Sequence, residues 1–186
     1  RAGIIGEMGC SWPWTEAERR SMHGAVIAQQ ETGSTITVHP GRHVDSLFEI
    51  IQFVHGSGGD VSRTIIGHID RTISDIEDLF RLADTGCVIE YDFFGIEGTL
   101  YPFSDLMLPN DGARLNAIHA LVERGHLDRI VISQDICTRT RQTDFGGHGY
   151  GHIYRNVVPI MRKRGFNEGE IKAILVDNPA RLLTFQ

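Results

Sequence analysis

Four residues that could bind a metal ion each stand at the C-terminal end of a separate apolar segment. They are Glu7, His39, His68 and Asp135. Imidazole and carboxylate groups are the ligands of hydrolytic zinc sites, where the metal lowers the pKa of water and polarises the bond to be cleaved. If the four segments are parallel strands, their C-terminal ends meet at one edge of a sheet. The residue types and their positions therefore predict a hydrolytic metal site.

Each of these residues also has a structural interpretation. A single histidine at a strand end is more often structural, but His39 and His68 are separated by about 30 residues, the length of one βαβ unit. That separation predicts the same position on two neighbouring strands, which favours metal ligands. Glu7 could instead be held by an arginine. Asp135 could instead cap the segment that follows it.

Four further residues near the strand ends are candidates for supporting roles. Asp70 and Asp92 are predicted to orient metal ligands through hydrogen bonds. Arg42 and Arg71 are predicted to hold an anionic group of a substrate, although either could pair with a structural carboxylate instead.

A glycine-rich segment near the C-terminal end carries two more histidines, His148 and His152. Their i, i+4 spacing resembles that of a metal-binding pair on a helix, but no catalytic glutamate accompanies them. We interpret them as loop or substrate contacts.

The apolar segments alternate with helical patterns along the whole chain. Short β-branched runs bounded by polar residues or glycine predict buried parallel strands. Thr15 with Glu18 predicts a capping box, and Ser74 is a candidate cap of a later helix. The predicted strands cover about 3–7, 34–39, 63–68, 87–91 and 129–135, and the predicted helices 15–32, 44–56, 74–84, 111–124, 151–164 and 167–176.

Five alternating βα units predict a parallel sheet with right-handed crossovers. The two longest loops, 92–110 and 136–149, follow the last two strands, as the functional loops of a barrel do. We therefore expect an α/β fold, a (β/α)8 TIM barrel represented by an incomplete set of about five βα units. A doubly wound five-stranded sheet is the alternative, but no glycine-rich phosphate loop follows a strand.

Composition narrows the class of protein. The chain has 186 residues, a hydrophobic content of 41% and a charged content of 23%, as expected of a single globular domain over 1–186. A net charge of −6 argues against nucleic acid as a partner, and the apolar runs are too short to cross a membrane. Three widely spaced cysteines favour a reducing, cytoplasmic location. Because the chain opens within a strand, we expect an upstream segment.

Seven segments resemble motifs of the phosphotriesterase-related proteins of the amidohydrolase superfamily, and the resemblance extends over essentially the whole chain. The segments are Gly6-Glu7-Met8-Gly9-Cys10-Ser11-Trp12-Pro13, His39-Pro40-Gly41-Arg42, Gly67-His68-Ile69-Asp70-Arg71-Thr72, Glu90-Tyr91-Asp92-Phe93-Phe94-Gly95, Gln134-Asp135-Ile136-Cys137, Gly146-Gly147-His148-Gly149-Tyr150 and Asn178-Pro179-Ala180-Arg181.

The resemblance implies a (β/α)8 barrel with a binuclear metal centre, of which this chain supplies strands four to eight, the C-terminal part. Glu7 then matches the position that bridges the two metals, and His39 and His68 match ligands of the second metal. Asp135 matches a metal ligand that also accepts a proton. The His-x-His pair on strand one of the family has no counterpart, because the sequence contains no such pair.

The function that the resemblance implies is hydrolysis by a bridging hydroxide of a binuclear centre. The two divalent ions are expected to be zinc, with manganese as the alternative. The substrate is expected to be a small amide, ester, lactone or phosphoester, and an N-acyl amide such as N-acetyltaurine or an N-acyl amino acid is favoured. A non-catalytic ligand-binding barrel that retains the metal-site residues is the alternative function. Association of copies, for example as a homodimer, is left open because a five-stranded sheet has unpaired edges.

Overall fold

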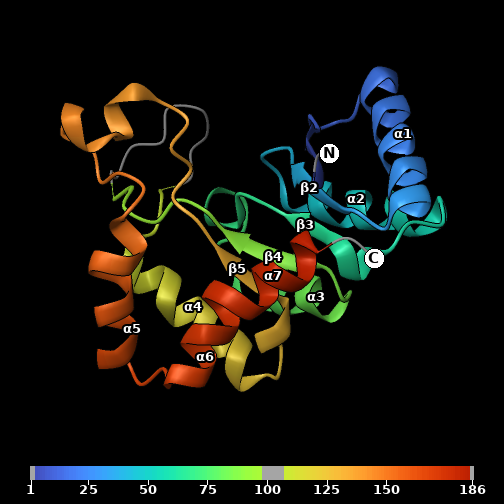
Figure 1. The fold of residues 1–186 in the computed structure, drawn as a ribbon. Coiled ribbons are helices and arrows are strands. Elements are labelled where there is room, and N and C mark those ends of the chain that lie inside the picture. Colours follow the sequence, from blue (N-terminus) through green and yellow to red (C-terminus); the bar gives the residue numbers. More distant parts are fainter. Residues whose placement is uncertain (1–2, 98–106, 185–186) are drawn as a thin grey trace.

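The structure, a computed structural model, describes residues 3–97 and 107–184 (Figure 1). One parallel sheet alternates with helices along the chain. The strands are β1 (Ile4–Gly9), β2 (Thr35–His39), β3 (Thr64–Ile66), β4 (Val88–Tyr91) and β5 (Ile130–Ile132). The helices are α1 (Glu16–Thr32), α2 (Val44–Gly56), α3 (Ile76–Asp84), α4 (Asp111–Glu123), α5 (Val158–Lys163), α6 (Glu168–Lys172) and α7 (Asn178–Leu183).

The strands lie side by side in chain order, β1-β2-β3-β4-β5, and every neighbouring pair is parallel. A doubly wound sheet reverses its strand order at a switch point, whereas a barrel adds each new strand to the same edge. The sequential order therefore excludes the doubly wound alternative. The predicted incomplete set of five βα units of a (β/α)8 barrel is confirmed.

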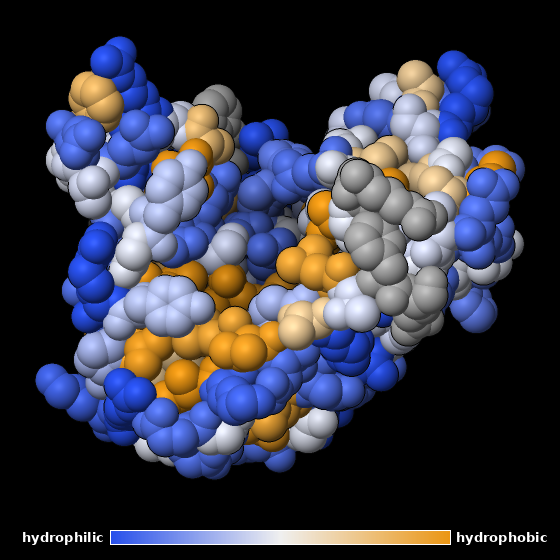
Figure 2. All heavy atoms as spheres, in the orientation of Figure 1, coloured by the Kyte–Doolittle hydropathy of each residue, from blue (hydrophilic) through white to orange (hydrophobic). Residues whose placement is uncertain are grey.

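Side chains of the strands alternate between two apolar layers, as the pleat of a strand requires. Ile36, Ile66 and Ile89 belong to the large core that the sheet forms with the helices. Ile65 and Val88 belong to a smaller cluster on the opposite side of the sheet, completed by the three residues Ile4, Val131 and Leu182. Figure 2 shows the molecule hollowed between α1 and the segment that follows β5, with hydrophobic side chains gathered below the hollow.

Two predicted helix starts have different outcomes. Thr15 Oγ1 accepts the Glu18 N–H at 3.3 Å, and the Glu18 carboxylate accepts the Thr15 N–H at 2.7 Å, so the predicted capping box is confirmed. Ser74 as a helix cap is wrong. The Asp75 carboxylate instead accepts the Glu77 N–H at 2.9 Å, and α3 begins one residue later. None of the helices in the described ranges is long and apolar enough to cross a membrane.

Two strands are shorter than their apolar patterns predict. The predicted strands 63–68 and 129–135 contain β3 and β5, which end at Ile66 and Ile132. The backbone leaves the extended conformation soon afterwards, since His68 and Asp135 both have positive φ angles. The predicted loop over 92–110 lies partly outside the described residues, because 98–106 are not described.

The last helical segment runs further than predicted. The expected helix over 167–176 continues through a π-helical turn (Ala173–Asp177) into α7, with Pro179 in the first turn of α7. The buried Asn178 donates to the carbonyl oxygens of Leu127 and Ile130, both at 2.8 Å. At the other end of α7, Thr35 Oγ1 donates to the Leu182 carbonyl at 2.6 Å. Helix α7 therefore closes the N-terminal end of the sheet.

Candidate metal centre

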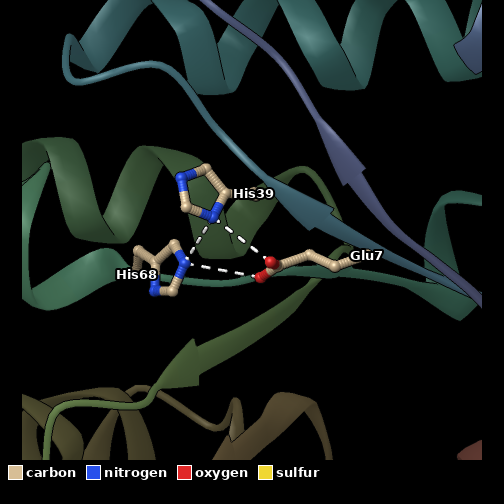
Figure 3. A group of neighbouring side chains, drawn as sticks. All are labelled: Glu7, His39 and His68. Carbon is tan, nitrogen blue, oxygen red and sulfur yellow. Dashed lines mark hydrogen bonds and ion pairs between the residues drawn. The ribbon is translucent and has the colours of Figure 1, made fainter. Parts of the chain in front are cut away.

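Glu7, His39 and His68 converge at the C-terminal end of the sheet (Figure 3). His39 Nδ1 lies 2.8 Å from His68 Nε2 and 3.2 Å from a carboxylate oxygen of Glu7. His68 Nε2 lies 3.4 Å from the other oxygen of that carboxylate. One ligand atom from each residue thus falls within 4.8 Å of the other two. The structure brings together three of the four ligands that the sequence predicts.

The position of Glu7 depends on an irregularity in β1. The register between β1 and β2 shifts between Ile5 and Met8. Gly6 has φ 113°, and a Cβ at this residue would lie 2.4 Å from the carbonyl oxygen of Thr37. Glycine is therefore required here, because a side chain would be both strained and in collision. The irregularity directs Glu7 toward the two imidazoles rather than along the regular pleat.

His68 is held by Asp92, which follows β4. The Asp92 carboxylate accepts the backbone N–H of His68 at 2.7 Å and lies 2.9 Å from His68 Nδ1. A proton on Nδ1 leaves Nε2 directed at Glu7 and His39 with its lone pair available. This is the arrangement by which a carboxylate fixes the tautomer and the ring of a metal-binding histidine. Asp92 therefore has the geometry predicted for it.

The electrostatics of the cluster favour a positive charge. Hydrogen bonds from His39 and His68 hold the pKa of Glu7 far below its ordinary value. Burial lowers the pKa of His68, but hydrogen bonds with Asp92 and Glu7 outweigh it and raise this pKa to about 10. A divalent cation supplies the same positive charge at this position. Two imidazole nitrogens and one carboxylate form a ligand set that suits zinc and leaves a coordination position for water or substrate.

Asp135 lies outside the three-residue cluster. Its side chain accepts a hydrogen bond from Arg141 at 2.7 Å, and its backbone is left-handed, with φ 40°. The Arg141 guanidinium lies 5.7 Å from the centre of the Phe93 ring, which is 5.3 Å from the His68 ring. These contacts place Asp135 on the same side of the sheet as the cluster, in a conformation that points its carboxylate at Arg141.

The other predicted supporting residues have different environments. Asp70 is buried and accepts hydrogen bonds from the backbone N–H groups of Asp92 and Phe93. Arg71 is buried and donates to the Pro40 carbonyl at 2.9 Å, so it joins the loops after β2 and β3. Arg42 is exposed in the loop after β2. Of the two predicted substrate anchors, Arg42 is therefore the one that solvent can reach.

The two histidines of the glycine-rich segment have their rings 5.4 Å apart, and each has its own partners. His152 Nε2 lies 2.6 Å from the Asp111 carboxylate, and its Nδ1 lies 2.9 Å from the side-chain amide of Asn156. His148 Nε2 lies 3.3 Å from the carbonyl oxygen of Gln134. Both residues contact neighbouring segments of the fold, and their interpretation as loop or substrate contacts stays a prediction.

Two charged residues near the site were not predicted, the half-buried Glu90 and the fully buried Arg114. Burial of the Glu90 carboxyl group and the charge of nearby Asp92 raise the pKa of Glu90 to about 8 from its ordinary 4.5. Arg114 is fully buried and binds Asp70 at 2.6 Å. Both carry a signal in the sequence. Glu90 interrupts an apolar strand, and Arg114 falls on the face of its helix that carries Ile118 and Leu121, where a charge requires a partner.

Comparisons with known proteins agree with this architecture. The sequence model of the Phosphotriesterase family matches residues 1–183. The chain is 49% identical to the N-acetyltaurine hydrolase of Dictyostelium discoideum over 99% of its own length and 50% of that protein. It is 44% identical to the N-acetyltaurine hydrolase of Homo sapiens over 100% of its own length and 54% of that protein. The chain therefore spans about half the length of these relatives.

Solved structures give the same relationship. A resiniferatoxin-binding protein from Rhodobacter sphaeroides superposes with a TM-score of 0.89 and 29% identity, covering 98% of this chain and 51% of that one. The phosphotriesterase homology protein from Escherichia coli, complexed with phosphate in its active site, superposes with a TM-score of 0.83 and 28% identity. The match covers 99% of this chain and 60% of that protein. The chain belongs to the phosphotriesterase family.

Proposed function

We propose that the protein is a metal-dependent hydrolase that cleaves a small N-acyl amide. The observation that carries the proposal is the convergence of Glu7, His39 and His68 at the C-terminal end of the sheet, with Asp92 behind His68. In parallel α/β barrels, catalytic groups gather at this end of the strands. The membership of the phosphotriesterase family supports a hydrolytic reaction.

The choice of substrate is supported by the relatives. The two relatives reported above are named N-acetyltaurine hydrolases, and they are 49% and 44% identical to this chain. N-acetyltaurine and N-acyl amino acids share an amide bond and an anionic group. An exposed guanidinium near the site is a suitable partner for that anion, and Arg42 has this character. We therefore propose Arg42 as the anchor of the anionic group.

The proposed chemistry divides between the metal and the protein. Glu7, His39 and His68 would hold a divalent ion, which supplies Lewis-acid polarisation of the amide carbonyl and an acidified water at neutral pH. Two such ions, with zinc favoured and manganese as the alternative, remain our expectation. Asp135 would accept the proton of the attacking water on a carboxylate oxygen and deliver it to the leaving nitrogen. For that step its side chain must exchange its contact with Arg141 for one with the water.

The test is metal content and hydrolysis measured together on the full-length protein and its His39→Ala variant. We expect about two zinc or manganese ions per chain, a reduced number in the variant, and hydrolysis of N-acetyltaurine that falls with the metal content. Metal-free protein, even after supplementation with both ions, would overturn the proposal.

One observation favours a second candidate function. The structure with a TM-score of 0.89 to this chain is called a resiniferatoxin-binding protein, so a ligand-binding barrel is the alternative. Bound metal without turnover of amide, ester, lactone or phosphoester substrates would favour it.

A cytoplasmic location stays an expectation, supported by the three cysteines, which are free.

A further inference from the structure

A buried arginine on α4 contacts three different segments behind the metal centre. Arg114 is completely buried. Its Nε donates to the Asp70 carboxylate at 2.6 Å, Nη1 donates to the Asp111 carboxylate at 2.7 Å, and Nη2 donates to the Ile96 carbonyl at 2.9 Å. Only a planar guanidinium has donors on three sides for partners placed in this way.

The three partners of Arg114 all involve the segment 92–96, which follows β4. Asp70 and Asp111 bind its backbone, and Ile96 is part of it. Asp70 accepts the backbone N–H groups of Asp92 and Phe93, at 3.0 and 3.3 Å. Asp111 accepts the N–H of Gly95 at 2.9 Å. Arg114 itself binds the carbonyl of Ile96. The segment is thus fixed at both ends through one side chain.

This segment begins with the residue that orients a candidate metal ligand. The Asp92 carboxylate binds His68 at both its backbone N–H and Nδ1. A continuous series of hydrogen bonds therefore runs from Arg114 to Asp70, from Asp70 to the backbone of Asp92, and from the Asp92 side chain to the ring of His68. Each link is buried, so water does not readily replace a lost bond.

We propose that Arg114 is a positioning residue for the metal site, which sets the orientation of His68 through Asp70 and Asp92. The inference rests on the proposed metal site. It goes beyond that site because it makes the orientation of His68 depend on a residue that lies on a helix outside the sheet. Hydrogen-bonding partners of metal ligands typically change metal affinity by about 10–100-fold when they are removed.

The chain offers a matched control. Arg63 is also buried, but it lies at the opposite end of β3 and donates to the carbonyl oxygens of Arg181 and Leu182, at 3.1 and 2.8 Å. Arg63→Met and Arg114→Met both remove a buried guanidinium and its hydrogen bonds. Arg114→Met also leaves the buried carboxylates of Asp70 and Asp111 without their charged partner, so we expect it to be the less stable variant. If Arg114 is only structural, the two variants should nevertheless have the same metal affinity when both are folded.

The first experiment measures zinc affinity of the full-length protein by competition with a chelator, at a temperature where near-ultraviolet circular dichroism shows each variant to be folded. We expect affinity to fall about 10-fold or more in Arg114→Met and to stay within about 2-fold in Arg63→Met. Arg114→Lys keeps the charge but not the three-sided geometry, so an intermediate loss is expected and serves if Arg114→Met does not fold. Equal losses in the Arg63 and Arg114 variants would overturn the proposal.

The second experiment is a double-mutant cycle between Arg114→Lys and Asp92→Asn. If Arg114 acts through Asp92, the lysine substitution should have little further effect on zinc affinity once Asp92 is changed. Fully additive losses would show that Arg114 acts by another route.

A metal-free measurement separates this inference from the proposed function. The NMR signal of His68 Nδ1–H should shift in Arg114→Lys and not in Arg63→Met, whether or not the protein binds metal.

Discussion

His68 and Asp92 are joined twice, because one carboxylate binds both the backbone N–H and the ring nitrogen Nδ1 of the histidine, at 2.7 and 2.9 Å. The backbone of His68 is left-handed at this point, with φ 55° and ψ 34°. A residue other than glycine rarely takes this conformation, and it persists where surrounding contacts enforce it. Asp92 supplies such contacts, so it controls both the backbone and the ring of a candidate ligand.

Asp92→Asn should weaken metal binding while the protein stays folded. An amide can still accept from the backbone N–H, but it no longer stabilises a proton on Nδ1 with a negative charge. We expect zinc affinity to fall about 10–100-fold in a chelator competition. Asp75→Asn is the matched control, because the Asp75 carboxylate caps α3 instead of binding a candidate ligand and asparagine caps a helix equally well. Equal affinities of the two variants would contradict the role of Asp92.

Gly6→Ala should disturb both stability and metal binding. The added Cβ would meet the Thr37 carbonyl oxygen at 2.4 Å with the backbone at φ 113°, so β1 must shift and take Glu7 with it. We expect a lower melting temperature and weaker zinc binding. Gly24→Ala is the control, since a Cβ there meets nothing within 4 Å and alanine favours the helix α1. Its melting temperature should rise slightly, and zinc affinity should not change. Unchanged zinc binding in Gly6→Ala would show that the irregularity of β1 does not determine the position of Glu7.

Glu90→Gln should stabilise the metal-free protein, and more so as pH rises. The folded state keeps Glu90 protonated up to its pKa of about 8, whereas the unfolded chain ionises it from about 4.5. Ionisation of Glu90 therefore favours unfolding increasingly between these two pH values, and glutamine removes that effect. Thermal unfolding at pH 5, 7 and 9 should show a stabilisation that grows up to about pH 8. A constant difference in melting temperature would show that Glu90 titrates normally.

Asp135→Asn should lower kcat by about 100- to 10,000-fold if Asp135 transfers the proton. The loss should appear in kcat, because asparagine has similar size but accepts no proton at neutral pH. Asp144→Asn, an exposed neighbour in the same long segment, is the control and should have normal kcat. Turnover of N-acetyltaurine with full metal loading is the measurement. Near-normal kcat in Asp135→Asn would remove Asp135 from the mechanism.

The regular parts of the site could be predicted from the sequence. His39 and His68 follow apolar runs one βαβ repeat apart, and parallel strands of successive units place their ends together. The capping box of α1 is equally local, because Thr15 and Glu18 are three residues apart. Patterns of this kind depend only on the period of each element and not on tertiary packing, so the structure agrees with what they predict.

Contacts between distant segments could not be predicted in this way. The pattern of β1 does not show that the register shifts at Gly6 and turns Glu7 toward the histidines. The pairing of Arg114 with Asp70 joins residues 44 positions apart, on a helix and a loop. The contact of Asp135 with Arg141 depends on a left-handed turn that the apolar run before it does not signal. Each of these features is decided by tertiary packing.

The closure of the sheet by α7 has a consequence for the order of folding. Thr35, at the start of β2, finds the acceptor of its hydroxyl group in Leu182, 147 positions later in the chain. Contacts of such separation carry a high entropic cost of loop closure, and they slow folding relative to local contacts. During synthesis, α7 can cover the N-terminal end of the sheet only after this helix has left the ribosome.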